Sequence, residues 1–526
     1  MSASVPLGVP VGVAITGVAA AVAVGLGGVR FLRVAQREHY VPGAALRFGW
    51  RWWVGAGPRV NRLLGALSVA LLVASWWWWP AAVLAAGSVA SGPVGLGLRG
   101  RTSPLAWTRR LRTLAAVGAI LACLGLGAGV AVFVLSSAGA GALVLVATAI
   151  VVPGIVDLAL WATAPLERRL VQPYVRRAAA RLRQVGPVVV AITGSYGKTT
   201  TKGYVAHLSG RQLAVVATPR SFNNRAGLAR AVNEHLEPGT QVFVAEMGTY
   251  GPGEIAELCS WVTPRVAVIT AIGPVHLERF GTEARIVAAK SEILERAEVA
   301  VLNVDSPPLA ELADKVAASG RRVLRCSGQW ADADLSVLTG PDEEALVVRR
   351  GGALVAEVQG VEAAPTNVAC AVAVALELGV SPEEVAARLP GLPSAPNRLV
   401  VRTTESGFTV IDDTFNSNPA GARLALASLC HHSADGHRRV VVTPGMVELG
   451  PSQRRENAAL ASAASTAATD LVIVGRTNRR ALLEGAGAHG SPVLVDTRDE
   501  AVAWVRAHLG PGDAVLYEND LPDHFP

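Results

Sequence analysis

The chain has 526 residues, 51% of them hydrophobic, and a mean hydropathy of +0.37, which is too apolar for a disordered protein or an ordinary soluble enzyme. Its net charge of +7 is unevenly spread: up to Arg112 there are 12 Arg, one Glu and no Lys or Asp, whereas the rest carries 36 basic and 40 acidic residues. The basic excess therefore indicates a membrane anchor rather than a nucleic-acid surface, and the length allows three or four domains.

Three charge-free stretches mark the first third of the chain. The first is long enough for one membrane helix, and each of the other two is long enough for a helical hairpin. They cover residues 5–29, 63–98 and 113–156. Pro80 and residues 136–141 are natural turning points inside the longer stretches. Basic residues follow the first stretch instead of preceding it, so we do not expect a cleaved signal peptide.

The arginines indicate the topology of this region. Arg30–Arg62 and Arg99–Arg112 hold seven and five Arg, so both segments are expected on the cytoplasmic side of the cell membrane. An even number of crossings must then separate them, which gives five helices, with the N-terminus outside and the chain after about Trp161 inside. The expected helices are 5–29, 63–80, 81–98, 113–135 and 139–161, within a transmembrane region 1–162. Trp76–Trp79 is expected to form an aromatic cluster at the membrane interface.

The pattern changes near Gly186, after a linker expected at 163–186. Short apolar runs then alternate with helical stretches, which predicts two α/β domains built on parallel sheets, at 187–395 and 396–526. Leu389–Asn397 is the expected hinge between them. The predicted strands are Val188–Ile192, Gln241–Ala245, Arg265–Ala271, Val299–Val304, Phe408–Ile411, Arg439–Thr443, Leu471–Val474, Val493–Val495 and Ala514–Tyr517.

Cysteine and lysine usage narrows the chemistry. The five Cys are scattered without a CxxC pair, which suits a reducing compartment and argues against a zinc site. Only four Lys stand against 44 Arg, and they are Lys198, Lys202, Lys290 and Lys315. The lysines that remain are therefore candidates for sites that require a compact amine. For Lys315, in a surface-like helix, chance is the better explanation.

The strongest motif joins a predicted strand to a helix at Thr193–Thr200, read TGSYGKTT. Glycines allow backbone N–H groups to close around a phosphate, and the following helix adds a positive N-terminus. Lys198 is expected to contact the β- and γ-phosphates, and a Thr hydroxyl to hold Mg²⁺. The spacing is shorter than in the general phosphate loop. The expected nucleotide-binding residues here are Gly194, Ser195, Tyr196, Gly197, Lys198, Thr199 and Thr200.

Further motifs follow in order along the chain. They are SFNN at Ser221–Asn224, AEMG at Ala245–Gly248 with GEI at Gly253–Ile255, GPVHLERFG at Gly273–Gly281, AKSE at Ala289–Glu292, Asn303, Asn367, Arg398, DDTFNSNP at Asp412–Pro419 and GMVELG at Gly445–Gly450. Across about residues 187–520 this series resembles the Mur ligases, which join amino acids or peptides to cell-wall precursors. The DDTFNSNP segment is similar to that of the MurF group, the D-alanyl-D-alanine-adding ligases.

The resemblance implies roles for individual residues. Lys198, Glu246, His276 and Lys290 would be catalytic, and Thr199, Glu246, His276 and Lys290 would hold two Mg²⁺ ions, with Lys290 carbamylated by CO₂. Asn303 and Asn367 would contact adenine, and Arg398 and Asp413 the ribose or phosphates. Asn223, Asn224, Asn416 and Asn418 would bind substrate. Without the resemblance, Glu246 could be a solvated strand end, His276 an exposed loop residue and Lys290 a surface residue of a helix. Asn303 and Asn367 could be ordinary turn or cap residues, and Arg398 and Asp413 a surface ion pair.

The implied reaction is ATP-dependent amide ligation that forms ADP. A carboxylate on a cell-wall or lipid-linked precursor becomes an acyl phosphate, which the amine of an amino acid or dipeptide then attacks. Positioning and charge neutralisation do most of the catalytic work, and closure of the C-terminal domain would exclude water. No nucleic-acid partner is expected.

Several features depart from the MurF pattern. About 25 residues between Trp161 and Val188 are too few for the family's UDP-binding domain, so the helices either hold a lipid-linked acceptor or only localise the enzyme. Pro444 replaces the Gly of a GDM motif and Gly445 its acid. Glu518–Asp523 is acidic, which suits a cationic donor or, in the favoured interpretation, a solvated tail. The alternatives are a synthetase for another envelope or secreted polymer, such as poly-γ-glutamate, and a non-catalytic membrane ATP sensor or scaffold.

Overall fold

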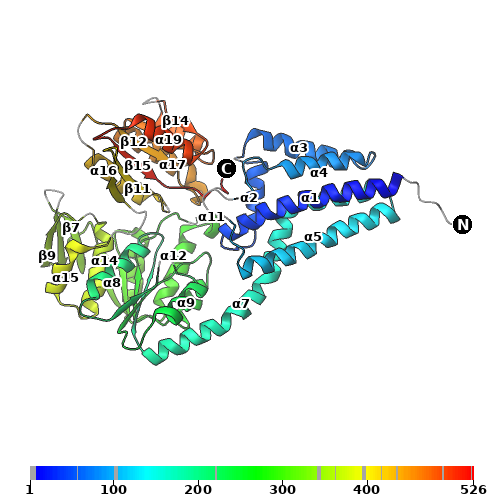
Figure 1. Ribbon diagram of the computed structural model, residues 1–526. Coiled ribbons are helices and arrows are strands. Elements are labelled where there is room, and N and C mark those ends of the chain that lie inside the picture. The colour runs from blue at the N-terminus through cyan, green and yellow to red at the C-terminus, as the bar shows by residue number, and fades with distance from the viewer. Residues whose placement is uncertain are drawn as a thin grey trace.

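A computed structural model describes the chain in three parts (Figure 1). A helical region extends to one side of a middle and a C-terminal α/β domain. The described residues are 8–55, 57–99, 105–219, 222–275, 277–340, 345–361, 363–393, 399–415, 417–433, 436–487, 491–522 and 524–526.

Seven helices make up the described helical region. They are α1 (Gly8–Arg37), α2 (Ala44–Trp53), α3 (Arg59–Ala74), α4 (Pro80–Ser91), α5 (Arg109–Leu135), α6 (Ala138–Ile150) and α7 (Val152–Val185). Helix breaks occur at both expected turning points, before Pro80 and at Ser136–Ser137. By length and composition, two helices in the described chain can cross a membrane, Val11–Arg37 and Arg109–Leu135, or three if α6 and α7 form one bent span. The five expected crossings stay a prediction.

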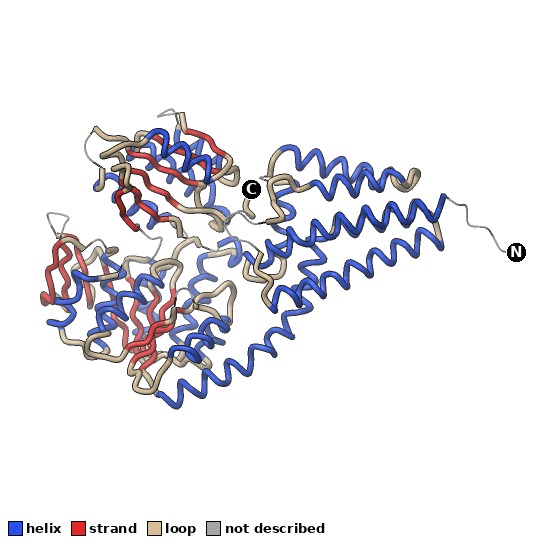
Figure 2. The backbone as a smooth tube through the Cα atoms, in the orientation of Figure 1, coloured by secondary structure: helices blue, strands red, loops and turns tan. Residues whose placement is uncertain are grey.

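Several parts of this region differ from the sequence prediction. In place of the helices expected at 63–80 and 81–98 the structure has α3, which ends at Ala74, and α4, which ends at Ser91. Arg30–Arg62, which was expected to lie between two membrane helices, is itself mostly helical, because α1 continues to Arg37 and α2 lies within the segment. The helix expected at 139–161 breaks at Val151 and bends by 64°, since Pro153 lies in the first turn of α7 and has no N–H to continue the bonding of α6. The expected linker belongs to α7, rich in the helix formers Ala, Leu and Arg, which runs on to the middle domain (Figure 2).

A nine-stranded sheet forms the middle domain. Its order is β2-β3-β1-β4-β5-β6-β7-β8-β9, parallel as far as β7 and antiparallel from there. The strands are β1 (Val188–Thr193), β2 (Val215–Ala217), β3 (Val242–Glu246), β4 (Val266–Ile269), β5 (Val299–Asn303), β6 (Arg322–Ser327), β7 (Leu335–Thr339), β8 (Ala345–Arg350) and β9 (Ala353–Gln359). Because side chains alternate along a strand, Val190 and Ala191 belong to separate cores on the two faces of the sheet.

Helices cover both faces of this sheet. They are α8 (Lys198–Ser209), α9 (Arg225–His235), α10 (Glu254–Cys259), α11 (Leu277–Phe280), α12 (Glu283–Ser291), η1 (Glu292–Leu294), α13 (Pro307–Ala318), α14 (Pro365–Glu377), α15 (Pro382–Arg388) and η2 (Leu389–Gly391). The almost wholly buried α14 packs against α8, and α7 packs against α9. Because β3, β1, β4 and β5 are parallel neighbours, their carboxyl ends lie along the same edge of the sheet. The start of α8, which follows β1, lies at this edge.

The C-terminal domain contains a second sheet of order β10-β11-β15-β12-β13-β14, parallel except for β10. Its strands are β10 (Val400–Thr403), β11 (Thr409–Asp413), β12 (Arg439–Thr443), β13 (Asp470–Val474), β14 (Val493–Val495) and β15 (Ala514–Glu518). Its helices are α16 (Pro419–His431), η3 (Gly450–Ser452), α17 (Gln453–Ala467), α18 (Arg479–Ala486) and α19 (Arg498–His508). All nine predicted strands are confirmed within two residues, but β2 and β6–β10 are additional.

Helix α2 connects the helical region to the two domains. The Asp157 carboxylate accepts from Ala45 N at 3.2 Å and Leu46 N at 2.8 Å, which satisfies free N–H groups in the first turn of α2. The Trp52 indole donates to His524 O at 2.8 Å, and the Phe48 ring lies 4.9 Å from that of Phe525. The end of the described chain thus packs against α2 instead of extending into solvent.

A buried charge cluster joins all three parts beside this contact. Arg279 of α11 donates at 3.0 Å to both Glu38 and Glu448, and His524 lies 3.0 Å from the other oxygen of Glu38. Burial alone raises the pKa of Glu38. The hydrogen bond and charge of His524 and the charge of Arg279 outweigh burial, so the net pKa lies below its ordinary value of 4.5.

This cluster predicts acid-sensitive docking of the domains. Because the Glu38 pKa is lowered in the docked state, its stabilisation is complete above pH 4.5 and lost as pH falls through the lowered pKa. Hydrogen exchange at α11, corrected for intrinsic rates, should rise on acidification in the wild type. Glu38→Gln should show faster exchange already at pH 7 and a flatter acid response. An identical pH response in both proteins would contradict this role.

Candidate active site

The loop between β1 and α8 has a backbone that glycine best supports. Gly194 and Gly197 have φ values of +152° and +81°. A Cβ on Gly197 would lie 2.5 Å from Asn367 Oδ1, and one on Gly194 would overlap the Thr270 hydroxyl. That hydroxyl donates to Tyr196 O at 2.5 Å and fixes the loop. The loop backbone is consequently held against Thr270 and Asn367, and α8, whose N-terminal N–H groups can bind a phosphate, begins directly after it.

Two of the four lysines converge on one carbonyl of this loop. Lys198 Nζ lies 2.7 Å from Gly194 O, and Lys290 Nζ, from the last turn of α12, lies 3.0 Å from the same oxygen. Lys290 is 3% exposed, and burial together with the charge of Lys198 lowers its pKa well below the ordinary value. Lys290 therefore spends more time as a neutral amine than a surface lysine does.

The Glu246 carboxylate ends β3 and is 1% exposed. Thr199 Oγ1 donates to its Oε2 at 2.9 Å, and Lys202 Nζ donates to the same oxygen at 3.0 Å. Asn223 Nδ2 donates to Oε1 at 3.1 Å. Because this carboxylate is buried and hydrogen-bonded, the alternative prediction that Glu246 is only a solvated strand end is wrong.

The same residues fit a magnesium ion bound together with phosphate. Mg²⁺ is usually held by one or two carboxylates, phosphate oxygens and water, and Glu246 Oε2 and Thr199 Oγ1 supply adjacent oxygens. In the described part of the chain, no group of three or more His, Cys, Asp or Glu could hold a metal, so the protein offers no closed all-side-chain cage there. His276, the expected ligand of a second ion, lies outside the described residues.

The expected adenine residues lie beside the loop. Asn303 Nδ2 donates to Thr270 O at 2.8 Å, and Asn367 Oδ1 accepts from Thr201 Oγ1 at 3.4 Å. Ser195 Oγ lies 3.1 Å from Gly273 N, which ties the loop to the segment after β4. Thr200 lies on the first turn of α8. The structure thus gathers residues separated by more than 160 positions, while their nucleotide contacts stay a prediction.

The expected substrate-binding asparagines have different surroundings. Asn223 lies against Glu246, whereas Asn224 caps α9 by accepting from Gly227 N at 2.9 Å. Asn418 caps α16 by accepting from Gly421 N at 3.0 Å. Both caps use the side-chain oxygen at the start of a helix. Asn416, Arg398 and Ser221 lie outside the described residues.

Asp413 lies in a buried carboxyl pair. It ends β11 directly beside Glu518 at the end of β15, and Glu518 also accepts from Ser417 Oγ. Burial and the Asp413 carboxylate raise the pKa of Glu518 well above its ordinary value. Glu518 is fully buried, so its assignment to a solvated tail is wrong. Parallel pairing of β11 and β15 is the reason, since it brings the two strand ends together.

A cavity of about 300 Å³ separates the phosphate loop from the C-terminal domain. Tyr196, Pro274 and Glu283 line its middle-domain side, and Arg423 and Arg455 line the opposite side. We call it the reaction cavity, because a group placed there would touch the phosphate loop and face the second domain. Its arginines can neutralise anionic oxygens.

Sequence comparison identifies the family. Residues 192–349 match the family model described as Mur ligase middle domain, and residues 397–517 match the one described as Mur ligase, glutamate ligase domain. The UDP-N-acetylmuramoyl-tripeptide--D-alanyl-D-alanine ligase of Mycobacterium leprae is 36% identical over 375 residues, covering 65% of this chain and 72% of that protein. The chain belongs to the Mur ligase family.

Other relatives and solved structures agree. The like-named Bacillus subtilis protein is 28% identical, covering 65% of this chain and 75% of its own. Acinetobacter baumannii MurF has a TM-score of 0.57 at 28% identity, covering 66% of this chain and 77% of its own. Thermotoga maritima MurF in complex with ADP has a TM-score of 0.56 at 25% identity, covering 66% and 80%. The expected ATP-dependent, ADP-forming carbon–nitrogen ligase class is confirmed for this Mur ligase.

Residue-level prediction missed two groups that shape the site. Lys202 pairs with Glu246 in the interior, and its survival in an arginine-rich sequence was the available signal. Thr270 holds the Mur ligase loop through Tyr196 O, but an isolated Thr after an apolar strand carries no comparable signal.

The Lys202–Glu246 pair predicts a large, asymmetric effect on stability. Lys202→Met should destabilise the protein by about 3–5 kcal/mol, because it leaves a buried carboxylate without its cation. Lys202→Met combined with Glu246→Gln should recover part of this loss, since neither group is then charged. Denaturant unfolding of the middle domain provides the measurement. A double variant no more stable than Lys202→Met would rule out the charge pair as the cause.

Proposed function

We propose that this Mur ligase is a membrane-anchored enzyme of the MurF type acting in peptidoglycan synthesis. It joins the carboxylate of a UDP-linked or lipid-linked muramoyl tripeptide to the amine of D-alanyl-D-alanine. The names of the relatives support this choice of substrates. The observation that carries the proposal is the phosphate loop itself, where Lys198 and Lys290 both contact Gly194 O and the next residue, Thr199, donates to Glu246.

The proposed reaction has two displacements. An acceptor carboxylate oxygen attacks the γ-phosphorus of ATP and forms an acyl phosphate. The bond from the γ-phosphorus to the bridging oxygen breaks, and ADP is the leaving group. The donor amine then attacks the acyl carbon, loses a proton, and inorganic phosphate leaves. Lys198 and the start of α8 would hold the phosphates, and Glu246 and Thr199 would hold Mg²⁺, which offsets negative charge. Arg423 and Arg455 would face the acceptor across the reaction cavity.

Lys290 is proposed to carry a carbamate. Its neutral amine would attack CO₂, forming an N–C bond while one C=O electron pair moves to oxygen and a proton leaves to solvent. The surroundings of Lys290 support this chemistry. Burial and the charge of Lys198 favour the neutral amine before the reaction, and the cation of Lys198 would stabilise the negative carbamate after it. The product would be a carboxylate beside Gly194, able to serve as a metal ligand.

Membrane attachment is supported by the outer surface of the helical region. Large apolar side chains remain exposed there, and they include Val18, Leu63, Ile120, Leu124 and Leu135. Such a surface is costly in water. The arginine-rich ends of these helices lie toward the ligase domains, whereas the N-terminal end of α1 lies far from them (Figure 1). Catalytic domains in the cytoplasm and an N-terminus outside follow from this asymmetry.

The proposed ligase activity predicts strict dependence on two substrates. Detergent-purified protein should release ADP only when both the muramoyl tripeptide and D-alanyl-D-alanine are present. The product mass should equal both substrates minus one water. Lys198→Ala should reduce turnover about 10²–10³-fold, because one phosphate-facing cation is lost. Lys315→Ala, at an exposed position of α13, is the matched control and should keep full turnover.

Other outcomes would refute this assignment. ADP release without an amine, or no ADP release with any acceptor tested, would contradict single ligation. Repeated addition of the donor would instead indicate a polymer synthetase of the poly-γ-glutamate type. The relatives do not favour that alternative or the non-catalytic sensor.

The carbamate predicts dependence on CO₂ and a specific chemical rescue. Lys290→Arg and Lys290→Ala should lose turnover while still binding ATP, and removal of dissolved CO₂ should slow the wild type. A short carboxylic acid should partly restore Lys290→Ala, because it supplies the missing carboxylate, but it should not restore Lys198→Ala. Carbon-13 labelled bicarbonate should give a carbamate signal in the wild type and in neither Lys290 variant. Normal turnover of Lys290→Arg would eliminate the carbamate.

A further inference from the structure

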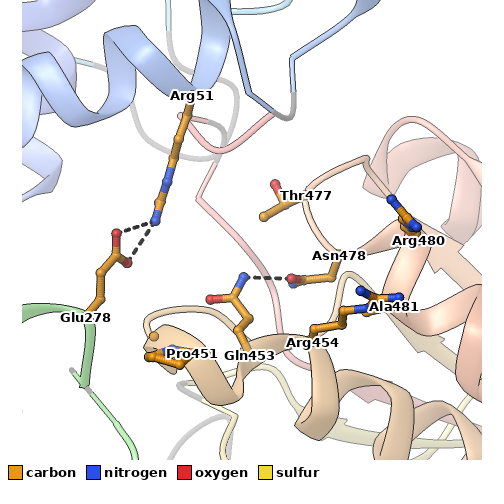
Figure 3. A pocket seen from close by; sticks show the side chains of 10 residues that line it. Arg51, Glu278, Pro451, Gln453, Arg454, Thr477, Asn478, Arg480 and Ala481 are labelled. Atoms are coloured by element: carbon orange, nitrogen blue, oxygen red, sulfur yellow. Dashed lines mark hydrogen bonds and ion pairs between the residues drawn. The ribbon is translucent and has the colours of Figure 1, made fainter. Parts of the chain in front are cut away.

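A second, larger cavity lies where the three parts of the chain meet. It has a volume of about 560 Å³, within the range of small-molecule sites. We call it the junction cavity. Its polar lining consists mainly of Arg51, Glu278, Gln453, Arg454, Asn478 and Arg480. In Figure 3, Arg51 reaches from α2 toward Glu278, while the other four belong to the C-terminal domain on the far side.

The junction cavity and the reaction cavity share one wall. Gly450 and Gln453 line the first and Ser452 the second, and on the facing helix Glu278 lines the first and Leu277 the second. Neighbouring residues of η3, the start of α17 and α11 thus face different cavities. An elongated molecule with its reactive end beside Tyr196 would have to run around the contact between η3 and α11 to place its other end in the junction cavity.

The charges of the junction cavity favour an anion. Arg51 donates twice to Glu278, at 2.6 and 2.8 Å, whereas Arg454 and Arg480 share the single carboxylate of Glu484. Three guanidinium groups therefore meet two carboxylates. Side-chain exposure is 67% for Arg454 and 85% for Arg480, so their ion pairs with Glu484 are weak and can be exchanged for a ligand. Planar guanidinium groups bind phosphate oxygens in pairs.

Arg51 is held in place before any ligand arrives. Its guanidinium carbon lies 5.1 Å from the centre of the Phe48 ring and 5.6 Å from that of Phe525. Together with Glu278 these rings fix its orientation, and Asp157 fixes the helix that carries it. The helical region therefore contributes one wall of the cavity, at the side of the ligase domains that adjoins the proposed membrane.

We propose that the junction cavity binds the diphosphate of the acceptor substrate. This inference rests on the proposed ligase function, because a nucleotide-linked or a polyprenyl-linked muramoyl peptide would each carry a diphosphate at the end opposite its reactive carboxylate. The acceptor spans both cavities, with its carboxylate at the phosphate loop and its diphosphate between Arg454, Arg480 and Arg51. The helical region thereby takes part in acceptor recognition as well as anchoring.

The test compares acceptors with and without the diphosphate. The full chain in nanodiscs is titrated, without ATP, with UDP-linked muramoyl tripeptide, polyprenyl-diphosphate-linked muramoyl tripeptide and free muramoyl tripeptide. Arg454→Gln combined with Arg480→Gln should weaken binding of a diphosphate-bearing acceptor about 10- to 100-fold, through loss of charge-assisted hydrogen bonds. Binding of free muramoyl tripeptide and of ATP should be unchanged. If the double variant weakens binding of just one diphosphate-bearing acceptor, that acceptor shows whether the natural substrate is linked to a nucleotide or to a lipid.

The control is Arg402→Gln, another exposed arginine of the C-terminal domain paired with an acid, and it should bind every acceptor as the wild type does. Equal loss for free and diphosphate-bearing acceptors, or no loss for either carrier, would overturn the proposal. Because binding is measured without turnover, the result is independent of the ligase assay. Where turnover occurs, the double variant should raise the KM for the acceptor and leave kcat unchanged.

Discussion

The buried carboxylate of Glu246 is the group on which the site depends. It is held by the ammonium of Lys202, the hydroxyl of Thr199 and the amide of Asn223, which come from α8 and from the segment before α9. A buried charge is costly unless paired and hydrogen-bonded, so these contacts fix the end of β3 relative to α8. Since α8 begins at the phosphate loop, the same interactions position Lys198.

A second constraint operates at α2. This short helix is capped by Asp157 of α7, packs on Phe525 and directs Arg51 toward Glu278. The helical region, the middle domain and the C-terminal domain therefore meet at one helix. The two cavities follow from this arrangement, because α11 and η3 pack against each other between them. Anchoring and substrate recognition are consequently linked through α2 in the proposed enzyme.

Much of the fold and the phosphate loop could be predicted because their signals are local. Apolar runs gave nine strands within two residues, and the glycines, Lys198 and Thr199 follow each other in sequence. Strands β2 and β10 were missed although both contain consecutive valines, because they are only three and four residues long and such short apolar runs also occur within helices. Asn224 and Asn418, which were expected at substrate, both cap helices, and their substrate contacts stay a prediction.

By itself, the sequence determined the α/β class, the phosphate loop, the family resemblance and the exceptional status of its lysines, because these depend on neighbouring residues and composition. Only the tertiary structure decided that Lys290 meets Lys198 at Gly194, that Glu518 is buried against Asp413, and that Arg51 faces Arg454 and Arg480 across a cavity. Such contacts join positions tens to hundreds of residues apart. They arise from strand order and domain packing, which no local pattern encodes.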